Sequence, residues 1–176
     1  MLYAAGLLVA TFERLSQAPT GFSAERLLTL NTVAESPQPT VYWDQVVEHL
    51  RVVPGVETVA LSSRALLSGY SSNDAVAVDG GAPSEDMAYF LNVSPGWLEA
   101  MKIPFTDGRD FRAGDTYLGV AIVSETFAKR FFQGRNPVGR WFERATDEGP
   151  RLRLQVVGLV RDAHYMEMRE PMLPVA

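Results

Sequence analysis

The chain has 176 residues, of which 47% are hydrophobic and 21% charged, which suits one compact domain or two small subdomains. The net charge of −5 argues against a global basic field of the kind that binds nucleic acid. Because the chain has no cysteine, disulfides, thiolate chemistry and Cys-ligated zinc or iron–sulfur sites are excluded.

The N-terminal stretch Leu2–Ala10 is uncharged and apolar. It has no basic region before it and no small-x-small cleavage signal after it, so it is a poor signal peptide. It is also shorter than the roughly 20 apolar residues that span a bilayer. Two interpretations stay open at this point: a buried helix of a soluble protein, or the last half of a transmembrane helix that meets water at Glu13 and Arg14.

The next segment predicts a β-α-β unit. Leu27–Val33 alternates imperfectly and indicates a strand, and Glu57–Ser62 indicates another. Between them Thr40 can cap a helix, which ends at Pro54-Gly55. The helix carries an apolar stripe of helical period that we expect to pack on the sheet: Trp43, Val46, Val47, Leu50 and Val53.

The middle of the chain predicts a hairpin followed by two short helices. Ala75–Val78 and Met87–Val93 can pair as antiparallel strands across a glycine-rich turn. Ser94-Pro95 is a strong helix start, with a hydroxyl cap before a proline. Because this region has its own hairpin and helices, we expect Asp74 to Phe132 (74–132) to form most of a second small mixed α/β subdomain.

The last third predicts a buried strand over Gly119–Val123 and a short helix capped by Ser124, with Phe127, Phe131 and Phe132 facing inward. Trp141–Glu143 and Leu152–Val160 follow as strands, and Arg161–Glu170 is either helical or irregular. Strands and helices are interleaved without a regular β-α-β-α alternation, so an α+β fold is favoured over a doubly wound sheet.

Charge is distributed unevenly along the sequence. Residues 65–101 contain five acids and no base, whereas residues 129–161 contain eight bases and three acids. Two interpretations apply: solvated strand and helix faces, or two surfaces of opposite sign that help to dock a partner.

Few residues suggest chemistry. His49 lies beside Glu48 near the polar face of the predicted helix, where a solvated role is expected. Asp162 and His164 form an Asp-x-His pair that can orient a base or ligate metal, but two groups do not complete a metal site.

The remaining acidic cluster predicts turns. Asp107, Asp110 and Asp115 lie close in sequence without the glycine and terminal glutamate of a calcium loop. The chain also lacks the glycine-rich and nucleophile motifs of nucleotide-binding proteins and hydrolases. The sequence therefore predicts no catalytic residue, no cofactor site and no metal site, and a protein that is not an enzyme.

Seven separated stretches, in one order and covering nearly the whole chain, resemble one family. Together they are similar to the periplasmic core domain of MacB-type ABC-transporter permeases. The stretches are Leu7–Phe22, with a "PTGF" exit; Leu50–Val59 (LRVVPGVETV); Val93–Ile103 (VSPGWLEAMKI); Gly108–Phe111 (GRDF); Val123–Phe132 (VSETFAKRFF); Asn136–Arg140 (NPVGR); and Val156–Tyr165 (VVGLVRDAHY).

The resemblance implies an architecture and a set of partners. It makes residues 1–18 the C-terminal part of a truncated transmembrane helix with its exit linker, and residues 19–176 an extracytoplasmic core domain. It implies a protein of the cytoplasmic (inner) membrane whose domain faces the periplasm or the outside. The implied partners are an ABC ATPase subunit, a second permease copy in a dimer, the membrane through the N-terminal helix, and a periplasmic adaptor or cargo.

The implied function is transport. ATP hydrolysis by the partner subunit would drive movement or export of cargo held outside the membrane. Such a role needs a stiff body joined to a transmembrane helix rather than a reactive residue. The alternatives are a soluble extracytoplasmic ligand-binding or sensor domain and a hydrolase with a dispersed site that uses Asp162 and His164.

Overall fold

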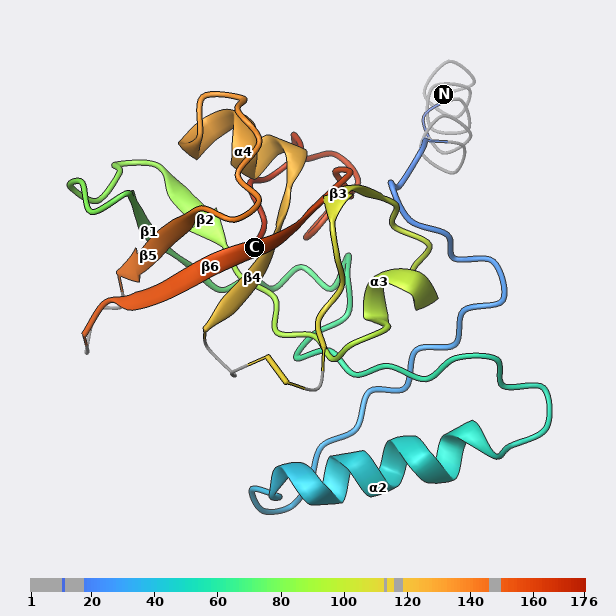
Figure 1. The fold of residues 1–176 in the computed structure, drawn as a ribbon. Helices are drawn as coiled ribbons and strands as arrows, with labels where there is room; N and C mark the ends of the chain where they lie inside the picture. The colour runs from blue at the N-terminus through green and yellow to red at the C-terminus, as the bar shows by residue number, and fades with distance from the viewer. Residues whose placement is uncertain (1–10, 12–17, 113, 116–118, 146–149) are drawn as a thin grey trace.

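The computed structural model describes Thr11 and residues 18–112, 114–115, 119–145 and 150–176 (Figure 1). The predicted membrane helix, residues 1–18, lies outside this part of the chain except for Thr11 and Ala18. Within the described residues, no helix combines the length and apolar character that crossing a membrane requires.

A six-stranded mixed sheet forms the body of the protein. Its strands run in the order β2-β1-β5-β6-β3, and β4 pairs with β6 off this path. The β4–β6 pair is parallel and the other pairs are antiparallel. This mixture confirms the predicted α+β class. The strands are β1 (Asn73–Val78), β2 (Met87–Tyr89), β3 (Phe105–Gly108), β4 (Val120–Ser124), β5 (Trp141–Ala145) and β6 (Leu152–Val160).

The C-terminal residues connect the two outer parts of this curled sheet. The Tyr89 amide donates to the Pro174 carbonyl at 2.8 Å, and Tyr89 and Val175 form a parallel bridge. On the other side, the Ser124 amide at the end of β4 donates to the Val175 carbonyl at 2.9 Å. The segment therefore lies between β2 and β4, where it satisfies backbone groups that would otherwise be unpaired.

Two apolar clusters cover the two faces of the sheet, as the alternation of side chains along a strand requires. In β4, Ala121 and Val123 belong to one cluster and Ile122 to the other. The first cluster centres on the fully buried Phe127 and Phe142. The second cluster, called here the Trp97 cluster, consists of Trp97, Leu98, Met101, Ile103, Ile122 and Val160.

Two short helices flank the sheet. The hydroxyl of Ser124 accepts a hydrogen bond from the Phe127 amide at 3.2 Å, so the predicted cap begins α4 (Glu125–Phe131). The other helix, α3 (Trp97–Ala100), has Gly96 as its N-cap. The prediction that Ser94 caps it is wrong, because the Ser94 hydroxyl accepts from the Leu61 amide at 2.9 Å instead.

The predicted β-α-β unit is present only as its helix. α2 (Thr40–Arg51) forms close to its predicted position, but none of its residues is buried. Leu27–Val33 is not a strand, and Glu57–Ser62 contributes only an isolated bridge from Ser62 to Val93. Residues 28–59, called here the arm, extend away from the sheet, with α2 well separated from it in Figure 1.

The two predicted strands of the arm do not form because alternating apolar residues provide an apolar face but no neighbouring strand to accept and donate hydrogen bonds. Neither predicted strand lies along an edge of the sheet, so Leu28 and Val33 are 80% and 89% exposed. The arm is anchored at its two ends, where Leu27 and Ala60 pack against the Trp97 cluster.

Strand pairing does not follow the expected boundary of the second subdomain, 74–132. Strands β1 to β4 lie inside this range and β5 and β6 outside it, yet β5 pairs with β1, and β6 pairs with β3 and β4. One sheet therefore joins residues that we expected in two subdomains, although its two faces carry separate apolar clusters.

Candidate functional site

The Asp162 carboxylate has a structural role at the start of α4. Its two oxygens accept hydrogen bonds from the Thr126 amide and the Thr126 hydroxyl, each at 2.8 Å. A carboxylate here satisfies a free amide of the first helical turn and lies at the positive end of the helix dipole. The side chain that the sequence offered as a base-orienting group is therefore committed to Thr126.

His164 does not complete a catalytic pair with Asp162. Its backbone amide donates to the Thr20 carbonyl at 2.8 Å, and its Nδ1 is buried without a hydrogen-bond partner. His49 is remote from this region, on exposed α2, where its Nδ1 lies 2.7 Å from the carbonyl oxygen of Gln45. The two histidines and Asp162 therefore have separate surroundings.

The three nearby aspartates build turns. Asp110 accepts the amides of Gly96 and Phe111, both at 2.8 Å. Asp107 accepts from Asn136 and from the Gly108 amide, and these bonds lower the pKa of Asp107. Across the described ranges no group of three or more His, Cys, Asp or Glu side chains is arranged to hold a metal ion.

Among the three aspartates, Asp115 is the one held by an arginine, Arg109. It binds Arg109 through both carboxylate oxygens, at 2.7 and 2.8 Å, in the bidentate geometry that arginine favours. The hydrogen bond from Arg109, followed by that from the Arg112 amide, lowers the pKa of Asp115 to about 2. The pair closes the turn after β3.

The oppositely charged stretches of the sequence form ion pairs with each other within the chain. Asp74 pairs with Arg144 at 2.5 Å, Asp79 with Arg140, and Asp86 with Arg130 at 3.3 Å. Because β1 and β5 are antiparallel neighbours, their acids and bases come to adjacent positions. These three ion pairs are contacts within the chain, and the interpretation of two docking surfaces of opposite sign stays a prediction.

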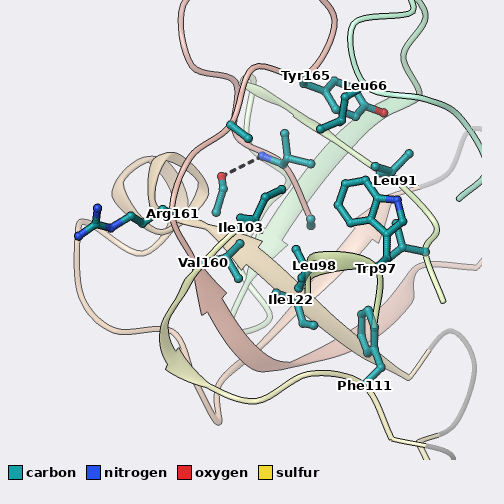
Figure 2. A pocket seen from close by; sticks show the side chains of 15 residues that line it. Leu66, Leu91, Trp97, Leu98, Ile103, Phe111, Ile122, Val160, Arg161 and Tyr165 are labelled. Atoms are coloured by element: carbon teal, nitrogen blue, oxygen red, sulfur yellow. Dashed lines mark hydrogen bonds between the residues drawn. The ribbon is translucent and has the colours of Figure 1, made fainter. Parts of the chain in front are cut away.

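A small, partly open apolar pocket with a cavity volume of about 80 Å³ lies against the Trp97 cluster (Figure 2). Side chains from α3, β4, β6 and the loops around residues 66, 91 and 111 line it. Figure 2 shows Trp97, Leu91 and Phe111 along one side, while the charged end of Arg161 points away from them. The sequence did not reveal this pocket, because its lining comes from segments far apart in the chain.

The two hydroxyl groups that line the pocket are engaged within the fold. The Tyr165 hydroxyl donates to the Phe90 carbonyl at 2.9 Å, and burial is the main reason that the pKa of Tyr165 is raised. The Ser124 hydroxyl accepts from Phe127 and from the Val175 amide. The pocket can therefore accommodate apolar surface, and it presents no nucleophile paired with a base.

A second hollow, with a cavity volume of about 210 Å³, adjoins the first. The two share Leu91, Val93, Phe111, Ile122 and Ala176 in their lining. The second hollow ends near Arg112 and Arg144, and Arg144 is held by Asp74 and lies over the Phe90 ring at 4.1 Å. Together the two hollows make one largely apolar surface beside β4.

The fold is similar to that of two solved transporter domains. The periplasmic region of MacB from Actinobacillus actinomycetemcomitans is similar over 76% of this chain and 61% of that one, with 14% identity and a TM-score of 0.52. The extracellular domain of the ABC-type transporter YknZ from Gram-positive bacteria is similar over 75% of this chain and 59% of that one, with 16% identity and a TM-score of 0.50.

The sequence itself shows the family. The family model described as MacB-like periplasmic core domain matches residues 3–171, so this chain belongs to that family. No curated protein matches the sequence. The chain spans about three fifths of the length of the two solved chains named above. The family is a domain of transporter permeases and not a known class of enzyme.

Proposed function

We propose that this chain is the extracytoplasmic domain of an ABC-transporter permease that couples ATP hydrolysis by a partner subunit to movement or export of cargo outside the membrane. The observation that carries the proposal is the family match over residues 3–171. In this proposal residues 1–18 continue a membrane helix of the cytoplasmic membrane, and residues 19–176 work beside a second permease copy.

The body has properties that suit this role. Fully buried Phe127 and Phe142 lie between β-strands and α4, and the ends of the sheet are bonded to residues 174–176. Such a body can move as a unit, because closely packed interiors deform little. Asp162, Asp110 and Asp115 are engaged in structural contacts, which suits a domain whose role is mechanical.

The test uses the complete permease and its ATPase. The complete reading frame is expected to encode four transmembrane segments, and the purified permease is expected to bind an ABC ATPase. With spin labels at Lys129→Cys in a detergent-solubilised or nanodisc complex, trapping the ATPase with ATP and vanadate is expected to change the distance between the domains of two permease copies. An ATPase variant that binds but does not hydrolyse ATP is the control.

The outcome that contradicts the proposal is a reading frame without membrane segments, or a permease that binds no ATPase and shows no ATP-dependent change. A second candidate is a ligand-binding or sensor domain, favoured by the apolar pocket against the Trp97 cluster. It predicts that an apolar ligand raises the melting temperature of the isolated chain, and that Trp97→Ala abolishes this increase.

A further inference from the structure

The exit segment Thr20–Phe22 lies in unusually close contact with the residues that follow β6. Gly21 has a φ of +82°, and a Cβ at this position would lie 2.3 Å from the Asp162 carbonyl oxygen and 2.5 Å from the Ala163 Cα. Both are backbone atoms, so no side-chain rotation can relieve the clash. Glycine alone therefore permits this approach.

Hydrogen bonds fix the chain on both sides of Gly21. The Thr20 carbonyl accepts from the His164 amide at 2.8 Å, and the Ser23 amide donates to the Met101 carbonyl at 2.9 Å. Between them, Phe22 packs against the Trp97 cluster. The exit segment Thr20–Phe22 and the following Ser23 are thus held by the body through the backbone or through a side chain.

The receiving segment, Arg161–Tyr165, connects this contact to the rest of the fold. It directly continues β6, and the Arg161 amide donates to the Pro104 carbonyl at 3.1 Å. Asp162 binds Thr126 at the start of α4, and the Tyr165 hydroxyl binds the Phe90 carbonyl. The position and direction of the backbone at Gly21 are therefore fixed relative to β6, α4 and the end of β2.

We propose that Thr20–Phe22 and Asp162–His164 form a rigid joint, called here the exit joint, which fixes the direction in which residues before Thr20 leave the body. Gly21 is its positioning residue, because it allows the two backbones to touch. The further statement that motion of a membrane helix passes through the exit joint to β6 and α4 rests on the proposed function.

The joint is tested first in the 176-residue chain. The Gly21→Ala variant is expected to raise the exchange rate of the His164 amide at least tenfold in residue-resolved hydrogen exchange. Because the chain has no cysteine, spin labels can be placed cleanly at Ala18→Cys and Lys129→Cys. Gly21→Ala is expected to at least double the width of the distance distribution between them.

Gly96→Ala is the matched control. Gly96 has a φ of +80°, but a Cβ there meets no atom within 4 Å, so the variant carries the same backbone strain without the clash. Its His164 exchange and label distribution are expected to match the wild type. Equal loosening by both variants, or none by Gly21→Ala, would overturn the joint.

Two further measurements keep the proposal falsifiable. If Gly21→Ala does not fold, hydrogen exchange of the His164 amide is measured in the wild-type chain alone. Protection of less than about tenfold relative to an unfolded peptide would contradict a rigid joint. In the complete permease, Gly21→Ala is expected to retain ATP hydrolysis and lose the nucleotide-dependent change at Lys129→Cys. If the wild type shows no such change, the proposed function fails while the joint measured in the isolated chain stands.

Discussion

The sheet body and the arm, residues 28–59, contain similar apolar patterns, but the apolar residues are buried in the body and not in α2 of the arm. In the body, the apolar residues of β4 alternate between two clusters, and Val123 is fully buried. In the arm, the stripe of α2 has helical period, yet α2 contains no buried residue. Helical periodicity therefore predicts α2 correctly even without burial, whereas the alternating segment Leu27–Val33 forms no strand because it lacks a neighbouring strand to pair with.

The largest expected effect is in the body. Phe127 is fully buried and its ring centroid lies 5.0 Å from that of Phe142 and 4.8 Å from that of Phe131. Phe127→Ala is expected to lower the free energy of unfolding by about 3–5 kcal/mol, since it removes buried area and leaves a cavity. Urea unfolding followed by circular dichroism measures this. A loss below about 1 kcal/mol would mean that α4 does not pack on the sheet.

The next effect concerns the contact that holds α4. Asp162→Ala leaves the Thr126 amide and hydroxyl without their acceptor and is expected to cost about 1–2 kcal/mol, as for lost helix caps. Asp162→Asn, which keeps one acceptor oxygen, is the matched control and is expected to cost less. Both are measured by urea unfolding. If Asp162→Asn costs as much as Asp162→Ala, the carboxylate does not act by accepting the Thr126 hydrogen bonds.

A smaller effect comes from Asp115. Its pKa is lowered from 3.8 to about 2, chiefly by the hydrogen bond from Arg109. A lowered pKa means that the stabilisation is present above pH 4 and is lost as the pH falls toward 2. We therefore expect the free energy of unfolding of the wild type to fall more steeply over this window than that of Asp115→Asn. Parallel profiles for the two proteins would contradict the pairing.

The smallest effect is expected in the arm. The apolar stripe predicts Leu50 in the core, where replacement by alanine costs roughly 2–5 kcal/mol. In the structure Leu50 lies on α2, where no residue is buried, so Leu50→Ala is expected to cost less than about 1 kcal/mol. Thermal and urea unfolding measure the difference. A loss above about 2 kcal/mol would show that the arm packs against the body after all.

The comparison also explains which predictions were correct. Leu152–Val160 and the Ser124 cap were confirmed because a continuous β-rich run and a hydroxyl cap are local properties. The antiparallel pairing of β1 and β2 was confirmed because the strands are neighbours in sequence, although β2 ends at Tyr89 rather than at Val93. The resemblance of seven stretches to one family was confirmed by the match over residues 3–171.

The sequence by itself determined α4 and the strands β1, β4, β5 and β6 of the body, its α+β class and its family, because these depend on short-range patterns and on the order of motifs. It did not predict β3 (Phe105–Gly108), which becomes a strand by pairing with β6. Only the tertiary structure decided that Leu27–Val33 finds no sheet edge, that Val175 lies between β2 and β4, and that Gly21 touches Asp162. It also decided that Asp74 pairs with Arg144. Each of these contacts is between residues far apart in the chain, and a local sequence pattern carries no information about which distant segments lie side by side in the fold.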